Sequence, residues 1–122
     1  MIVKFSDERL MHVITCDVPD LLKYRDIILI KRYTSLWKDF FAIIDIYDHK
    51  LSKVVICDTA DELVNVINEM SCTQGHPEPV IHSCAVKIVD EYSGREELVT
   101  GSFHAGIPVR WVVSCIKHVF EQ

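Results

Sequence analysis

The sequence predicts an α+β fold, a mainly antiparallel sheet of about five to seven strands with two longer helices packed on one face. Short apolar runs rich in Val, Ile and aromatic residues recur along the chain between polar turns, as strands do. Two segments instead carry apolar residues at helical spacing. A length of 122 residues, 49% hydrophobic and 25% charged, suits a single α+β domain over residues 1–122.

In the first half of the chain, short strands are expected at residues 2–5 and 10–16. Asp17 followed by Pro19 predicts the start of a short helix that ends near Tyr24.

The next three apolar segments are predicted to form the centre of the sheet. A β-branched run predicts a strand at residues 27–33, and two apolar strands at residues 40–47 and 51–57 are joined by a hairpin loop at residues 48–50. Because apolar residues fall on both faces of these two strands, a central position is expected.

The clearest helix is expected at residues 59–70, where Thr59 and Glu62 form a T-x-x-E capping box before an apolar stripe. A second helix at residues 107–120 is opened by Pro108 and closed by Lys117 and His118.

Between these helices, strands are expected at residues 80–89 and 97–103, around a turn near Gly94. The predicted core includes Ile44, Ile56, Leu63, Ile67, Val86, Val112 and Ile116.

Location and redox state follow from apolar runs and cysteines. No run approaches the stretch of about 20 apolar residues that crosses a bilayer, and charges interrupt the N-terminal segment, so a cytoplasmic protein without a membrane partner is expected.

The cysteines are Cys16, Cys57, Cys72, Cys84 and Cys115. An odd number without a C-x-x-C pair predicts free thiols, with Cys57 and Cys84 buried and inert.

Charge points to a protein partner. The net charge is −5, and residues 62–122 hold four Lys and Arg against eight Asp and Glu. This balance favours a basic protein and makes nucleic acid binding unlikely. The predicted partner-binding residues are the acids Asp90, Glu91, Glu96 and Glu97 around one turn, the acids Asp58, Asp61 and Glu62 at a helix start, and the aromatic anchors Trp37 and Tyr92.

The leading hypothesis is therefore a small acidic immunity protein or antitoxin, of the contact-dependent growth inhibition type. It would neutralise a toxin such as a nuclease by covering its basic active site. This hypothesis assigns the protein no catalytic residue, no cofactor and no metal.

Two other function classes stay open at this stage. A small enzyme would use Cys57 beside Asp58 as a nucleophile, or a metal held by Cys72, His76, His82 and Cys84. A phage or host adaptor would bind single-stranded nucleic acid through basic and aromatic residues at Lys31, Arg32, Tyr33, Trp37 and Lys38.

Overall fold

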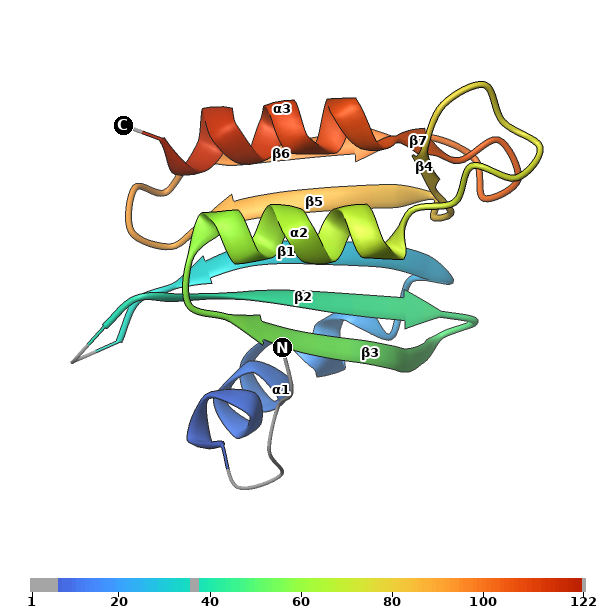
Figure 1. Cartoon of the computed structure of the whole chain (residues 1–122). Helices are drawn as coiled ribbons and strands as arrows, with labels where there is room; N and C mark the ends of the chain where they lie inside the picture. The colour runs from blue at the N-terminus through green and yellow to red at the C-terminus, as the bar shows by residue number, and fades with distance from the viewer. Residues whose placement is uncertain (1–6, 36–37, 122) are drawn as a thin grey trace.

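The structure is a computed structural model that describes residues 7–35 and 38–121. Within these ranges the elements follow one another as shown in Figure 1. They are α1 (Glu8–Leu21), β1 (Asp26–Tyr33), β2 (Phe40–Tyr47), β3 (Lys50–Cys57), α2 (Ala60–Met70), β4 (Val80–Ile81), β5 (Ala85–Asp90), β6 (Glu96–Thr100), β7 (Ile107–Pro108) and α3 (Val109–Phe120). The predicted α+β class is confirmed.

The main sheet has five strands in the order β3-β2-β1-β5-β6. β1–β2, β2–β3 and β5–β6 pair antiparallel, whereas β1 and β5 run parallel, so the sheet is mixed. β4 and β7 form a separate two-stranded sheet. The chain crosses from β3 to β5 by way of α2, which lets β5 join β1 in parallel.

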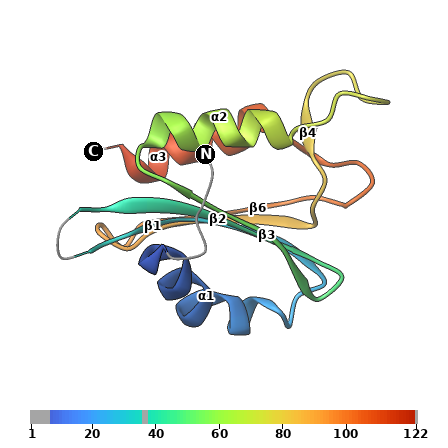
Figure 2. The same ribbon diagram turned by 60° about the horizontal axis from the view of Figure 1, so that its bottom comes forward.

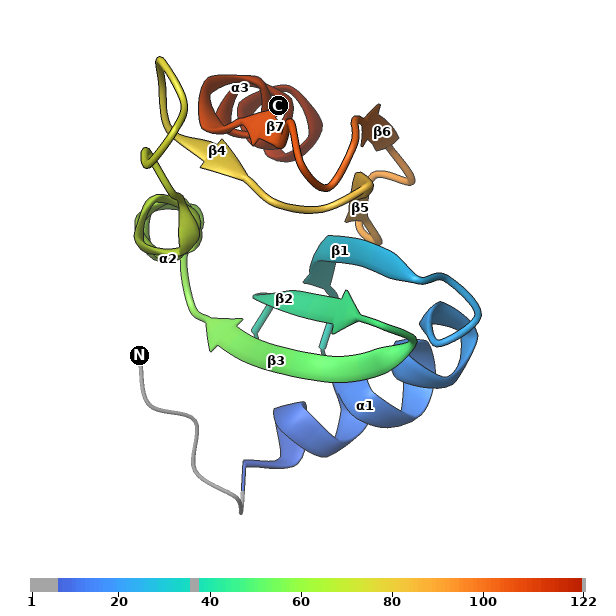
Figure 3. The same ribbon diagram turned by 90° about the vertical axis from the view of Figure 1, so that its right-hand side faces the viewer.

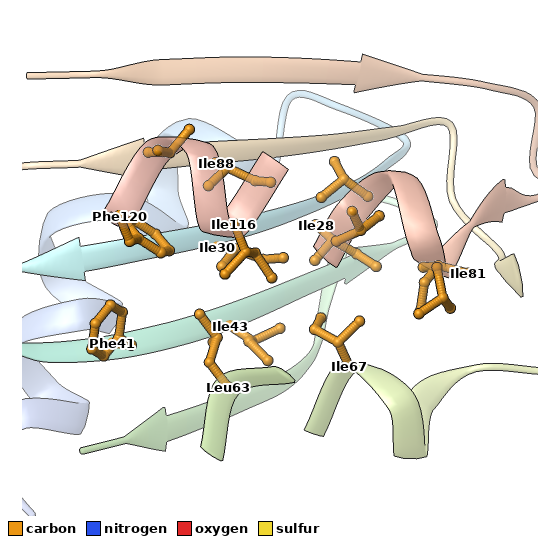
Figure 4. Close-up of a cluster of buried hydrophobic side chains, with 14 of the residues drawn as sticks. Ile28, Ile30, Phe41, Ile43, Leu63, Ile67, Ile81, Ile88, Ile116 and Phe120 are labelled. Atoms are coloured by element: carbon orange, nitrogen blue, oxygen red, sulfur yellow. The ribbon is translucent and has the colours of Figure 1, made fainter. Parts of the chain in front are cut away.

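The helices α2 and α3 pack on the same face of the sheet, as predicted. Their buried stripes meet alternate residues of the central strands, including Ile28, Ile30 and Ile43, in one apolar cluster (Figure 4). Thr59 caps α2 through a bond from the Glu62 amide at 3.2 Å. The Glu62 carboxylate accepts a bond from the Asp58 amide, one residue before the position that a capping box predicts.

The helix α1 covers the other face (Figure 2) and, with 14 residues, is longer than α2 and α3, so the expectation of two longer helices on one face is only partly met. It buries Val13, Val18 and Leu21 in a second apolar cluster with Ile27 and Ile44. The central strands are therefore buried on both faces, which explains their nearly continuous apolar sequence.

The strand predicted at residues 10–16 is wrong, because this segment lies in α1. Val13, Ile14 and Thr15 favour strands locally, yet they belong to a helix that begins at the Asp7 cap. The short helix expected from Asp17 is the end of the same helix, so Pro19 lies inside a helix rather than in its first turn.

Other boundaries differ less. The strand predicted at residues 80–89 divides into β4 and β5, because residues 82–84 leave one sheet before the chain joins the other. The strand expected at residues 97–103 is β6, which ends at Thr100, and the last helix begins at Val109. The strand predicted at residues 2–5 lies outside the described residues.

All seven predicted core residues are buried. Five of them lie in the cluster beneath α2 and α3, and Ile44 and Ile56 lie in the cluster beneath α1. Within the described residues, no helix combines the length and the apolar character that a membrane span needs.

Candidate protein-binding surface

The turn between β5 and β6 holds four of the predicted partner-binding acids, but Asp90 is not on the surface. Its side chain is fully buried and pairs with Arg32, whose Nε donates to Oδ1 at 2.9 Å. Ser93 Oγ and the Tyr92 amide also donate to this carboxylate. Burial alone would raise the pKa of Asp90, but these hydrogen bonds outweigh it and lower the pKa. Asp90 therefore holds the turn together.

The other acids of this turn differ in how free they are. Glu91 accepts a bond from Thr34 Oγ1 at 2.8 Å and lies 3.5 Å from Lys31. The Glu97 carboxylate forms hydrogen bonds with Cys115 and His118 on α3, and these hydrogen bonds lower the pKa of Glu97. Glu96 is exposed and forms no ion pair with any described residue. Of the four, Glu96 is the carboxylate most available to a partner.

Tyr92 remains a candidate anchor. Its side chain is 64% exposed, and its ring lies 5.5 Å from the guanidinium carbon of Arg32. Trp37, the other predicted anchor, lies outside the described residues.

The acids just before and along α2 also differ in whether they are paired. Asp58 pairs with Arg9, whose Nη1 lies 2.7 Å from Oδ1, and Glu62 bonds to the backbone. Asp61 and Glu69 are exposed and have no ion pair in the described part of the chain. These two carboxylates give the outer side of α2 its negative charge.

Part of the sheet beside α1 is left uncovered by the described helices. This helix packs against β2 and β3, and no described helix covers the same side of β5 and β6 (Figure 3). We call this area the open sheet face; its residues are Ala85, Lys87, Val89, Glu96, Leu98 and Thr100. A groove of about 450 Å³ separates it from the second half of α1.

The groove is lined by both apolar and charged side chains. Its apolar lining residues include Ile27, Leu29 and Val89, and its charged lining residues include Asp20, Lys23, Lys87 and Glu96. Lys31 also lines the groove but is already paired with Asp17, at 3.1 Å. An apolar centre with a polar rim is typical of protein interfaces.

Leu98 is the residue that sequence analysis missed. It lies in the middle of β6, on the open sheet face, and is 61% exposed. The sequence pattern places Leu98 on the same side of the strand as Glu96 and Thr100, but only the structure shows that this side of β6 is exposed.

The candidate nucleophile Cys57 is fully buried. Burial, aided by the nearby Glu62 carboxylate, raises the pKa of its thiol to about 11, which keeps it protonated at neutral pH. Its neighbour Asp58 points to Arg9 instead. Nothing in this geometry activates the thiol.

The four candidate metal ligands are not gathered around one point. The rings of His76 and His82 lie 5.1 Å apart, but Cys84 is directed to Asp26 and the Cys72 backbone pairs with Val80. No group of three or more His, Cys, Asp or Glu suited to a metal occurs among the residues that the structure describes. Cys84 is half-buried, so the expectation that it is buried is wrong.

The basic stretch proposed for nucleic acid is largely neutralised within the protein. Lys31 is paired with Asp17 and Glu91, Arg32 is paired with Asp90, and Tyr33 is buried. Lys38 is exposed. Lys31 and Arg32 therefore offer a phosphate backbone little free charge.

No family model matches the chain, and comparison with curated proteins and with solved structures found no match.

Proposed function

We propose that this protein acts by binding another protein, and that it is an immunity-type inhibitor that covers the basic active site of a toxin such as a nuclease. The observation that carries the proposal is the open sheet face with Leu98 exposed at its centre. An uncovered apolar area with a charged rim is a surface that a partner can bury.

The charge of the protein supports a basic partner. The net charge is −5, and Asp61, Glu69 and Glu96 are exposed without an ion pair in the described chain. Active sites that bind nucleic acid phosphates are basic, so an acidic inhibitor is attracted to them over a distance. In this proposal, charge speeds the encounter and buried apolar contacts around Leu98 hold the complex.

The first test is biological. Each gene next to the one for this protein should be expressed in a host cell, alone and together with it. We expect one neighbouring product to arrest growth alone and growth to return when this protein is present. Toxicity that persists despite stable expression of this protein, for every toxic neighbour, contradicts the proposal.

The second test separates contact from steering in the purified complex. Leu98→Ser should raise the dissociation rate about 30-fold, which corresponds to a hot spot of about 2 kcal/mol. Leu51→Ser is the matched control, because Leu51 is 39% exposed but lies on β3, at the other edge of the sheet. Equal effects of the two changes would mean that the open sheet face is not the interface.

Steering is measured by association kinetics. The triple change Asp61→Asn, Glu69→Gln and Glu96→Gln should slow association at low salt and flatten its salt dependence. Dissociation should change less. If the triple variant associates as fast as the original protein at every salt concentration, these charges do not steer the encounter.

A further inference from the structure

The sheet has two edge strands, and they are protected to different degrees. In β3 the pairing with β2 shifts between Asp45 and Ile46, which leaves Ser52 as an extra residue flanked by Leu51 and Lys53. A bulge with a lysine beside it is a common device that stops another strand from pairing with an edge. β6 pairs with β5 without a shift and contains no proline. β6 is therefore the edge that is open to pairing.

Backbone hydrogen bonds at the two ends of β6 show which of its groups point outward. The Asp90 amide donates to the Arg95 carbonyl at 2.8 Å, and the Gly101 amide donates to the Cys84 carbonyl at 3.0 Å. In an antiparallel pair, alternate residues face the same way, so Glu97 and Val99 also bond to β5. The N–H and C=O groups of Glu96, Leu98 and Thr100 thus point away from the sheet, and within the described chain they have no backbone partner.

Exposed apolar side chains flank this edge on both sides of the sheet. Leu98 lies on the α1 side. On the other side, Glu97 contacts Cys115 and His118 of α3, which runs opposite to β6 (Figure 1). Two residues along β6 and one helical turn back along α3 cover similar distances, so from the Glu97 contacts we place Trp111, one turn before Cys115, near the level of Val99. Trp111 is 46% exposed.

Charge at the edge selects the kind of segment that fits. Glu96 and Glu97 are adjacent at the start of β6. The nearby cation Arg95 is occupied, because its Nη1 donates to the carbonyls of His118 and Glu121 at 3.3 and 2.8 Å. Lys87 lies behind β6, on β5. An approaching strand therefore meets two acidic residues at one end, Glu96 without an ion pair among the described residues and Glu97 already paired with His118, and apolar side chains further along.

We propose that the free edge of β6 is the docking site for an extended segment of the partner protein, which joins the sheet as an additional antiparallel strand. Its apolar side chains lie opposite Leu98 and Val99, and its basic side chains lie opposite Glu96 and Glu97. The inference rests on the proposed function in taking a basic protein as the partner. Main-chain bonds supply affinity in such docking, and the flanking side chains supply specificity.

A tethered probe tests the docking mode without the natural partner. Nη1 of Arg95, the residue directly before β6, donates to the Glu121 carbonyl at 2.8 Å. A segment fused to the C-terminus is therefore tethered within reach of β6. A linker of about ten Gly and Ser residues spans roughly 17 Å, the length of the strand, and holds the segment at about millimolar effective concentration. The probe segment is Thr-Val-Leu-Lys-Lys, which sets its lysines opposite Glu97 and Glu96 when it pairs antiparallel.

The readout is hydrogen exchange at single amides, followed by NMR. We expect exchange at Glu96, Leu98 and Thr100 to slow about tenfold or more with the basic segment. The matched control, Thr-Val-Leu-Glu-Glu on the same linker, should leave the three amides unprotected. Equal rates with both segments, or protection confined to residues outside β6, would overturn the proposal.

A pair of substitutions then separates this inference from the proposed function. Leu98→Pro removes the outward N–H but no bond to β5, whereas Leu98→Ala removes only side-chain contacts. Toxin binding that is about tenfold weaker for Leu98→Pro than for Leu98→Ala supports strand addition. Equal weakening would refute strand addition and leave toxin inhibition standing. Protection by the tethered segment without rescue from any toxin would refute the function and leave the docking site standing.

Discussion

Replacing Asp90 with Asn should lower the free energy of unfolding by about 3 kcal/mol, because it leaves a charged Arg32 without its buried partner. Asp90 is fully buried, and the side chain of Arg32 is 16% exposed between the rings of Phe41, Tyr92 and Phe120. Breaking a buried pair by removing one member costs about 3–5 kcal/mol. The low end applies here because water still reaches part of Arg32.

The pH dependence of this effect has a defined sign. The pKa of Asp90 is lowered in the folded protein, so ionisation of Asp90 stabilises the fold above its unfolded pKa of about 3.9. That contribution is lost as the pH falls through the folded value. The difference in free energy of unfolding between the original protein and Asp90→Asn should therefore have its full size at pH 7 and shrink toward zero in acid.

Urea unfolding followed by circular dichroism measures both effects. The midpoint should fall while the slope stays unchanged, which shows that the native fold is retained. Glu91→Gln is the matched control, because Glu91 is the next residue in the chain and its side chain is exposed. This change should alter the free energy of unfolding by no more than about 0.5 kcal/mol. A loss below about 1 kcal/mol for Asp90→Asn at pH 7, or a loss that persists unchanged in acid, would refute the reasoning.

Three further outcomes are expected. A thiol reagent at neutral pH should label the exposed Cys16 first and Cys57 last, because Cys57 is buried and its pKa is raised to about 11; equal labelling rates would contradict this. Thr59→Ala should cost about 1 kcal/mol in thermal unfolding through loss of the α2 cap, and the exposed Thr73→Ala should cost little. Gly106→Ala should destabilise more than Gly75→Ala: both glycines have a φ of +76°, but only at Gly106 would the new Cβ lie 2.7 Å from a Val80 methyl. Equal losses at the two glycines would show that the contact with Val80 relaxes freely.

The elements predicted correctly are those whose local pattern and tertiary environment agree. The apolar strands at residues 40–47 and 51–57 and the capped helix after Thr59 are examples. Their core residues, such as Ile44 and Leu63, followed from the same patterns. In these segments the spacing of the apolar residues indicates both the type of element and the side that it buries.

The first helix was missed because its local and tertiary preferences conflict. Val13, Ile14 and Thr15 are β-branched, and Pro19 cannot donate the helical hydrogen bond at its position. Burial of Val13, Val18 and Leu21 against the sheet outweighs these preferences. That gain exists only once β1, β2 and β3 are in place.

The candidate binding surface divides in the same way. The sequence by itself determined the acidic balance, the apolar strands, and the two helices α2 and α3 with their apolar stripes, because composition and period are local properties. Only the tertiary structure decided that Asp90 is buried against Arg32, and that β5 joins β1 in parallel at the side of the sheet that α1 leaves uncovered. Both depend on contacts between segments that are far apart in the chain. A local sequence pattern does not predict which segment pairs with which. For the same reason Leu98 became visible as an exposed apolar position only when the strands on one side of it, and the open edge on the other, were known.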